Sequence, residues 1–310
     1  MTAARQILIA GTGAMATLFA WRLASAGNDV TMLGTWQPGL EALAQRGARL
    51  VDARGNEAAV PVRVTRDPAA CKGARQAIVL VKAWQTARVA EQLRQSLAAD
   101  GLAVTVQNGL GNYEVLASAL RKERVALGTT TTGATLLGPG LVKPAGNGSI
   151  SIQSHERLAP LAAALTASGF KVNVVPDAHE LLWAKLVINS AINPLTALLR
   201  VQNGELLERP TARALMRALA QESAAVAAAE GVQLAGDDPA ALVEEVARQT
   251  AGNYSSMLQD IQRGAPTEID AICGAITRAG QRHGLPTPLN EAFWRLVAAL
   301  TPVAAEVVRT

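Results

Sequence analysis

The stretch Gln6–Leu33, "QILIAGTGAMATLFAWRLASAGNDVTML", joins an apolar strand, a glycine turn, a helical segment and a second apolar strand. Gly11 and Gly13 follow the first strand directly, and the small residue Ala16 takes the third position of the pattern G-x-G-x-x-G/A. Gly11 permits the tight turn, Gly13 lets a pyrophosphate approach the backbone, and Ala16 lets the helix pack on the sheet. Glycine turns also occur for steric reasons alone, but the strand–turn–helix context favours dinucleotide binding.

The helix that opens after this turn offers unpaired backbone N–H groups and a partial positive charge to phosphates. We therefore predict that the whole turn contacts a dinucleotide cofactor, which adds Thr12, Ala14 and Met15 to the candidate residues.

Short apolar runs continue to alternate with helical segments as far as Pro176. Strands are expected at 29–33, 76–82, 102–108, 125–131, 149–153 and 170–176, with a helix at 84–99. The segment 49–65 alternates in hydropathy and predicts a small antiparallel excursion that turns at Arg54–Asn56. Continuous apolar strands separated by helices predict a parallel sheet covered on both faces. The fold class is therefore α/β, with a Rossmann-like, doubly wound domain over residues 1–176.

After Pro176 the strand signals stop. Helices are expected at 179–200, 204–231 and 238–262, with two more from Thr267 to the end, and Asp177 is a suitable cap for the first. Residues 177–310 are thus predicted to form an all-α domain, which is expected to close over the ligand-binding edge of the sheet. Ligands of doubly wound sheets bind beyond the carboxyl ends of the strands.

The composition excludes several classes of protein. Among 310 residues, 49% are apolar and 17% charged, and the net charge of +4 comes from scattered basic residues without a nucleic-acid-binding motif. No run of about 18 uncharged apolar residues predicts a membrane span, and the opening residues do not resemble a signal peptide. Cys71 and Cys273 give neither metal spacing nor a disulfide framework. A cytoplasmic protein without a metal site is expected, and the excess of positive charge suits an anionic small molecule at least as well as nucleic acid.

The end of the second strand departs from the usual cofactor pattern. An NAD site usually carries Asp or Glu about 20 residues after the turn, for the ribose hydroxyls. That place holds Gly34, Thr35 and Trp36, which include neither an acid nor a basic partner for a 2′-phosphate. Lys82, at the end of the expected strand "IVLVK", is the nearest basic candidate at the same edge of the sheet. Its alternative interpretation is an ordinary strand-end lysine that extends into solvent.

The stretch Glu180–Arg200, "ELLWAKLVINSAINPLTALLR", is apolar except for a few polar side chains. Lys185, Asn189 and Asn193 are spaced by four residues and share one face of a helix. A buried charge without a partner is very costly, so this polar stripe must meet polar groups. One interpretation is a polar seam between packed helices, with the lysine paired to a carboxylate. The other is a binding site for a polar ligand.

Several motifs resemble those of one known family, the ketopantoate reductases (2-dehydropantoate 2-reductases). Besides the glycine turn, they are "VKAWQT", "QNGLGN", "GTTTTGA", "WAKLVINSAINPLTAL", "NGEL" and "YSSMLQDIQRGAPTEID". They cover nearly the whole chain, and the stretches around Lys185 and Ser256 are long and unusual in composition. The resemblance implies an N-terminal Rossmann-like domain, a helical C-terminal domain, NADP(H) as cofactor and a 2-oxo acid as substrate.

The resemblance also implies roles for individual residues. Lys185 matches the catalytic lysine that protonates the carbonyl oxygen, in a cleft between the two domains. Asn189 and Asn193 match substrate-binding asparagines, and Ser256 matches the ligand of the substrate carboxylate. Glu268 matches a carboxylate that touches substrate and cofactor ribose, and Asn108 an asparagine that contacts substrate and nicotinamide ribose. Ala134 matches a further cofactor contact.

The chemistry of the residue types agrees with these roles. Hydride arriving at a ketone carbon leaves negative charge on the oxygen, which a nearby ammonium can stabilise and protonate. Amides and a hydroxyl orient a substrate without competing for the proton, and Glu268 could hold the position and the charge of the lysine.

The chain departs from the family at two places. Thr35 stands where many members carry an Arg for the 2′-phosphate, which predicts a narrow preference for NADPH over NADH. Thr132 and Gly133 replace residues that are often bulkier, which would widen a substrate pocket.

Three hypotheses about function follow. The first is an NADPH-dependent reductase of 2-dehydropantoate in pantothenate and coenzyme A biosynthesis. The second is a related oxidoreductase that acts on another 2-oxo acid or uses NADH. The third is a cofactor-binding sensor without catalysis, which the presence of both Lys185 and Glu268 disfavours. The Ala/Leu-rich surface of the helical half is compatible with a homodimer.

Overall fold

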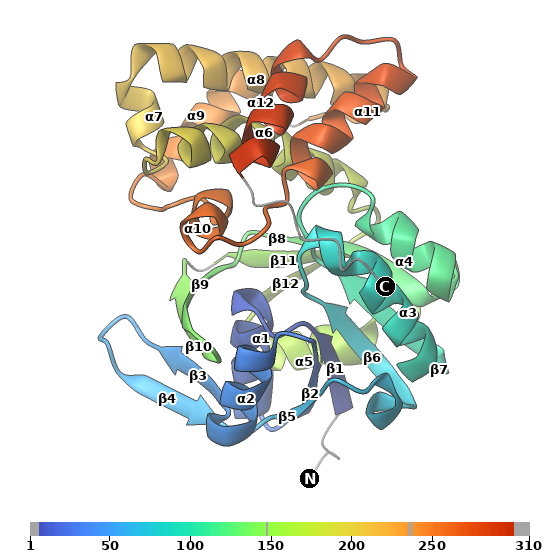
Figure 1. Ribbon diagram of the computed structural model, residues 1–310. Helices are drawn as coiled ribbons and strands as arrows, with labels where there is room; N and C mark the ends of the chain where they lie inside the picture. The colour runs from blue at the N-terminus through green and yellow to red at the C-terminus, as the bar shows by residue number, and fades with distance from the viewer. Residues whose placement is uncertain (1–5, 147, 235, 237, 301–310) are drawn as a thin grey trace, which may run out of the picture. The chain divides into compact units, whose positions relative to one another are not determined.

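The computed structural model describes residues 6–146, 148–234, 236 and 238–300 (Figure 1). The chain forms two compact units. The first consists of Met1–Gln107 and Asn112–Ala178, and the second of Asn108–Gly111 and His179–Thr310. The short segment Asn108–Gly111 thus belongs to the second unit although it lies inside the first in sequence. The sequence had predicted a single boundary between the two units, after Pro176.

The first unit is built on a sheet of eight strands in the order β12-β11-β8-β7-β6-β1-β2-β5. In chain order they are β1 (Gln6–Ala10), β2 (Asp29–Leu33), β5 (Arg63–Thr65), β6 (Ala74–Val79), β7 (Leu97–Thr105), β8 (Val125–Thr130), β11 (Ser149–Gln153) and β12 (Lys171–Val175). All neighbours pair in parallel except β8 and β11, which are antiparallel.

Helices cover both faces of this sheet (Figure 1). They are α1 (Ala14–Ser25), α2 (Gln37–Arg46), α3 (Thr86–Ser96), α4 (Asn112–Leu120) and α5 (Ala159–Ala167), with the short 3-10 helices η1 (Pro68–Cys71), η2 (Ala83–Gln85) and η3 (Lys122–Arg124). Ile7 and Ile9 of β1 pack in one core cluster with α1 and α5, and Leu8 and Ala10 pack in another with α3 and α4. Successive side chains of a strand point to opposite faces, so the predicted doubly wound fold is confirmed.

A second, smaller sheet has the order β4-β3-β10-β9. Its strands are β3 (Ala48–Val51), β4 (Glu57–Val60), β9 (Gly133–Gly138) and β10 (Leu141–Ala145). The antiparallel pair β3–β4 was predicted, and the carboxylate of Asp52 organises its turn by accepting the backbone N–H groups of Arg54 and Asn56. The hairpin β9–β10 was missed, although Pro139-Gly140, which connects its strands, is a turn signal.

One part of the predicted excursion is wrong. The segment 63–65 does not continue the antiparallel hairpin but forms β5, which pairs in parallel with β2 at the edge of the large sheet. Pro61 stands directly after β4 and has no N–H to donate to a strand ladder. Strand β4 therefore ends at Val60, and the chain returns to the large sheet.

The second unit is all-α among its described residues, as predicted. Its elements are α6 (His179–Leu199), α7 (Glu205–Glu208), α8 (Pro210–Ala229), α9 (Pro239–Gln249), α10 (Ser256–Gln262), the π-helix η4 (Asp270–Gly274), α11 (Ala275–Arg282) and α12 (Pro288–Leu300). Two of the predicted helices are interrupted: Pro210 starts α8 after the short α7, and residues 250–255 separate α9 from α10.

Helix α6 is the centre of this unit because its side chains belong to both helical core clusters. Trp183 and Leu186 pack in one, and Val187 and Leu195 pack in the other. Among the described residues α6 is also the one helix long and apolar enough to cross a membrane, and 67% of its apolar window is buried inside the protein. That burial is typical of a core helix.

A buried polar network fixes α6 against its neighbours. The hydroxyls of Ser190 on α6 and Ser223 on α8 lie 2.8 Å apart, and Asn290 on α12 donates its Nδ2 to Ser223 at 3.1 Å. Glu222 accepts the same Nδ2 at 2.9 Å and the backbone N–H groups that begin α12. Helix α8 is thus tied to both α6 and α12 by side chains of defined geometry.

We expect Ser190→Ala and Ser223→Ala each to lower the free energy of unfolding by about 1–2 kcal/mol, because each leaves a buried polar partner with fewer hydrogen bonds. The double variant should lose less than the sum of the two, since both substitutions remove the same contact. Urea unfolding measures this, with the exposed Ser25→Ala as control. Strictly additive losses would show that the two hydroxyls do not interact.

Candidate functional site

The glycine turn connects β1 to α1 and lies next to the ends of two neighbouring strands. The N–H of Gly11 donates to the carbonyl of Leu33 at the end of β2 (2.8 Å), and the N–H of Leu80, just after β6, donates to Ala10 (2.9 Å). Gly11 has a φ of +134°, and a Cβ there would lie 3.0 Å from the carbonyl oxygen of Leu80. Only glycine fits this position without strain.

Gly13, by contrast, borders open space. It is the N-cap of α1, and a Cβ placed on it would have no heavy atom within 4 Å. Ala16 is fully buried, so the first turn of α1 packs closely against the sheet. The first backbone N–H groups of α1, from Ala14 and Met15, have no partner within the helix. Open space in front of a helix N-terminus is the shape that a pyrophosphate group needs, so the residues present fit a dinucleotide.

The end of β2 touches the same turn. A Cβ on Gly34 would lie 2.7 Å from Cγ2 of Thr12, which is itself buried, so Gly34 allows the second strand to approach the turn. Thr35 follows and is partly exposed. Ala134, near the start of β9, packs on the same small apolar cluster as Ala14 of α1.

Lys82 lies on the other side of the turn from Thr35. It follows β6 as the N-cap of η2 and is partly exposed. In the sheet order β6-β1-β2, Lys82 comes from the strand on one side of β1 and Thr35 from the strand on the other. The two candidate cofactor residues therefore flank the glycine turn.

In the second unit, Lys185 and Glu268 form the charged centre of the polar stripe. Lys185 is partly exposed on α6, and Glu268, two residues before η4, is only 6% exposed. Burial lowers the pKa of the Lys185 ammonium from 10.5 to about 8, and the charge of Glu268 opposes that shift. Lys185 can thus change its protonation state close to neutral pH.

Asn108 joins this pair. Its Nδ2 donates to Oε2 of Glu268 at 3.1 Å. The segment Asn108–Gly111 is fixed beside η4, because the N–H of Leu110 donates to the carbonyl of Ala271 at 3.0 Å. Gly109 has a φ of +82°, and a Cβ there would lie 2.4 Å from that carbonyl oxygen. Gly109 and the π-helix η4, a feature frequent at functional sites, were missed from sequence, although Asn-Gly is itself a turn signal.

The two asparagines of the stripe occupy the turns of α6 that follow Lys185. Asn189 is partly exposed and Asn193 is buried, at 7%. Pro194 comes next and has no N–H for the carbonyl of Ser190. The thiol of Cys273 in η4 lies 3.9 Å from that carbonyl and donates to it instead. This contact ties η4 to α6 behind the stripe.

Ser256 is the first residue of α10 and is exposed. The residue before it, which sequence reasoning did not select, makes the structural contacts. The hydroxyl of Ser255 accepts the N–H of Leu258 (3.1 Å) and the hydroxyl of Thr196 on α6 (2.7 Å). Ser255 thus anchors the start of α10 beside the Asn193 end of α6, and leaves Ser256 with no structural task of this kind.

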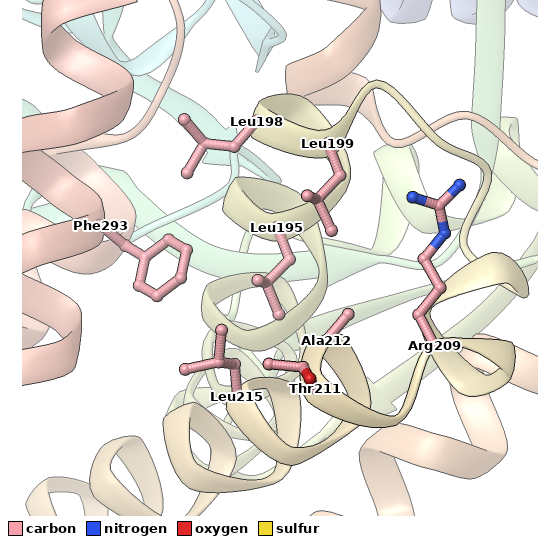
Figure 2. A pocket seen from close by; sticks show the side chains of 8 residues that line it. All are labelled: Leu195, Leu198, Leu199, Arg209, Thr211, Ala212, Leu215 and Phe293. Carbon is pink, nitrogen blue, oxygen red and sulfur yellow. The ribbon is translucent and has the colours of Figure 1, made fainter.

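A separate apolar pocket of about 310 Å³ lies in the second unit (Figure 2). It is lined by Leu195, Leu198, Leu199, Arg209, Thr211, Ala212, Leu215 and Phe293. At 100° per residue, Leu195 points away from the face that carries Lys185 and Asn193. The pocket therefore does not belong to the polar stripe.

Comparison with known proteins gives the same family for both units. Residues 7–157 match the family described as ketopantoate reductase PanE/ApbA, and residues 177–301 match its C-terminal domain. The 2-dehydropantoate 2-reductase of Archaeoglobus fulgidus is 36% identical over 298 residues, which cover 94% of this chain and 97% of that protein.

Solved structures agree with this result. A PanE/ApbA family ketopantoate reductase from Ralstonia eutropha JMP134 superposes with a TM-score of 0.88 at 33% identity, covering 95% of this chain and 98% of the other. The ternary structure of D-mandelate dehydrogenase with NADH and anilino(oxo)acetate gives a TM-score of 0.89 at 29% identity, with the same coverage. The resemblance seen in the sequence motifs is confirmed.

The titration of Lys185 gives a prediction about stability. Because its pKa is about 8 in the folded protein and 10.5 when unperturbed, the unfolded chain binds the extra proton between these values. Raising the pH through this window therefore stabilises the folded protein. The stability of the parent relative to Lys185→Met should increase from pH 8 to pH 10.5, as measured by urea unfolding.

The exposed Lys143→Met is the control and should show no such trend. In a Glu268→Gln background the window should begin at a lower pH, since Glu268 supports the charged lysine. A difference between parent and Lys185→Met that stays constant with pH would contradict the lowered pKa.

Proposed function

Because the chain belongs to the ketopantoate reductase family, a family of NADP-dependent oxidoreductases, we propose that it reduces 2-dehydropantoate to (R)-pantoate with NADPH, with Lys185 as the general acid. The observation that carries this proposal is the Lys185–Glu268–Asn108 cluster on and beside an otherwise apolar helix. A lysine whose pKa is lowered by desolvation beside a specific carboxylate is a candidate for a functional site.

The proton of the reaction is assigned to Lys185. When bound, the reduced nicotinamide supplies the hydride. Charge that develops on the ketone oxygen is stabilised by the ammonium, which then gives up its proton to that oxygen. A pKa of about 8 suits this task, because the group is mostly protonated at neutral pH and still releases its proton readily.

Glu268 and Asn108 are assigned a positioning role toward Lys185. The carboxylate of Glu268 favours the protonated lysine, and the amide of Asn108 holds that carboxylate at 3.1 Å. Since the backbone of Asn108–Gly111 is bound to Ala271, the amide is held in a defined place before any ligand arrives. Preorganised polar groups of this kind cost no rearrangement at the moment of reaction.

Asn189, Asn193 and Ser256 are assigned to the substrate. The two amides lie on the face of α6 that carries Lys185, at successive turns, and can bond the oxygens of a 2-oxo acid without donating a catalytic proton. Ser256 is free of the capping bonds that occupy Ser255, and it stands at the positive end of α10, where a carboxylate is favoured.

A second candidate is a reductase of a different 2-oxo acid. It is favoured by the similarity to D-mandelate dehydrogenase, whose structure holds NADH and anilino(oxo)acetate. The small residues Thr132, Gly133 and Ala134 at the start of β9 are also compatible with a bulkier substrate. Loss of nicotinamide absorbance, measured for a panel of aliphatic and aromatic 2-oxo acids with each cofactor, separates the two. The highest kcat/KM with an aromatic 2-oxo acid would favour the second candidate.

Lys185→Ala should lower kcat by roughly 10²–10⁴-fold, the usual contribution of a positioned general acid, while cofactor affinity stays within a few-fold of the parent. Steady-state kinetics and cofactor titration measure the two effects, and the exposed Lys143→Ala is the matched control. Turnover close to that of the parent would remove Lys185 from the mechanism.

The same assignment has a pH dependence. In the parent, kcat should fall above about pH 8 as Lys185 loses its proton, and in Glu268→Gln the fall should begin at lower pH. Lys185→Arg keeps the charge but does not release a proton, so its kcat should stay low and show no such fall.

Asn193→Ala should raise the KM for the 2-oxo acid by about tenfold or more, since a buried hydrogen-bonding partner of the substrate is lost at a cost of about 1–3 kcal/mol. The KM for the cofactor should not change. The exposed Asn173→Ala serves as control. An effect on the cofactor constant instead would show that Asn193 does not face the substrate.

A further inference from the structure

The end of β2 lacks a basic side chain for a 2′-phosphate in its own loop, since Gly34, Thr35 and Trp36 carry no charge. A 2′-phosphate carries close to two negative charges, so its binding site needs a cation. A planar guanidinium is the side chain best suited to bind phosphate. The strand next to β2 at the edge of the sheet is β5, which comes from about thirty residues further along the chain.

The structure brings the end of β5 directly beside the end of β2. The two strands are parallel and in register from Thr31–Arg63 to Leu33–Thr65. The pairing continues one step further, because the N–H of Gly34 donates to the carbonyl of Thr65 at 3.1 Å. Arg66 therefore follows the last paired residue of β5 just as Thr35 follows Gly34. Gly34 in turn contacts Thr12 of the glycine turn, so all these residues lie at one edge.

The side chain of Arg66 points toward the start of α2. Its Nη1 donates to Oε1 of Gln37, the first residue of α2, at 2.8 Å. Arg66 and Gln37 are both exposed, so the guanidinium is accessible to a ligand. The guanidinium therefore lies at Gln37, which is two residues after Thr35 in sequence. Gln37 is at the N-terminal end of a helix, where the backbone adds positive potential.

The charge of Arg66 is not neutralised by a neighbour in the described part of the chain. Its bonding partner is an uncharged amide, and no ion pair forms to it there. Asp67, the next residue, turns its carboxylate to the N–H of Ala69 as the cap of η1. The acid Glu41, on the same helix as Gln37, accepts the Nε2 of Gln37.

Arg63, the first residue of β5, differs from Arg66 because its charge is paired. Its guanidinium is paired with Asp29 and donates to Oγ1 of Thr31 at 3.2 Å. Arg63 thus has a structural partner at the opposite end of the strand, whereas Arg66 has an accessible charge at the end where ligands of such sheets bind.

We propose that Arg66 is the residue that recognises the 2′-phosphate of the cofactor, in place of the basic residue absent at position 35, with Gln37 holding the guanidinium and Thr35 adding a hydroxyl. This inference rests on the proposed NADP(H)-dependent function. It moves the main determinant of cofactor choice from Lys82, which follows β6 on the far side of β1, to the strand beside β2.

The test uses the full-length protein and two nucleotides without nicotinamide, adenosine 2′,5′-bisphosphate and 5′-AMP, with binding measured by calorimetry. The parent should bind the bisphosphate more tightly. Arg66→Ala should lose roughly tenfold to a hundredfold of that affinity, the range of one or two charge-assisted hydrogen bonds, and should bind 5′-AMP as before. The loss should shrink at high salt, because the guanidinium is exposed.

Three variants make the result specific. Arg66→Lys should keep part of the preference, since it retains the charge without the planar fork. Arg63→Ala should keep all of it. Lys82→Ala should change the ratio of the two affinities less than Arg66→Ala does. The ratio of kcat/KM for NADPH to that for NADH should follow the same order.

The outcomes that overturn the proposal are distinct from failure of the proposed function. A parent that prefers the bisphosphate, with a preference unchanged in Arg66→Ala or abolished by Lys82→Ala alone, overturns the role of Arg66 and leaves the reductase assignment intact. A parent without any preference overturns both the role of Arg66 and the choice of NADPH. Failure of 2-dehydropantoate as substrate, with the bisphosphate result as expected, overturns only the substrate.

Discussion

The second unit depends on one constraint, a lysine charge that is held on the central helix of an apolar core. Helix α6 packs its other faces against both helical clusters, so the face that carries the partly exposed Lys185 is fixed in direction. Desolvation lowers the pKa of this ammonium, and Glu268 supports the charged form. Removing a charge from water is so costly that the surroundings must be built for it. The Asn108–Glu268 bond and the glycine at position 109 are parts of that construction.

The same helix is also held from behind, which gives the stripe a fixed direction. Ser190 bonds Ser223, and the carbonyl that Pro194 leaves without a helical donor is met by the thiol of Cys273. Cys273 belongs to η4, the element that also receives the N–H of Leu110. The π-helix therefore links the polar face of α6, the carboxylate of Glu268 and the segment of Asn108. A displacement of any one of them would displace the others. A proton donor that must point in a defined direction needs neighbours fixed in this way.

Much of this could be predicted from sequence, because periodicity is a local signal. The spacing of Lys185, Asn189 and Asn193 follows from helical geometry, and the alternation of strands and helices up to Pro176 identifies the doubly wound sheet. What could not be predicted depends on pairing between distant segments. The hairpin β9–β10 joins β3 across about ninety residues, and β5 leaves the predicted excursion to pair with β2. The membership of Asn108–Gly111 in the second unit is a further case, since no pattern within four residues reveals the backbone that they contact.

Cofactor recognition shows why this distinction matters for function. A fingerprint read along the chain examines only the loop after β2, where Thr35 offers a single hydroxyl. A ligand at the edge of a sheet is surrounded by the ends of neighbouring strands, and their order in space differs from their order in sequence. Here β5 takes the place beside β2 after an excursion through β3 and β4, and so brings Arg66 to the end of β2, whose own loop carries no cation. Loss of a basic residue at one strand end can therefore be compensated by gain at the adjacent one. The chemistry that discriminates two cofactors then belongs to the edge of the sheet rather than to a single loop.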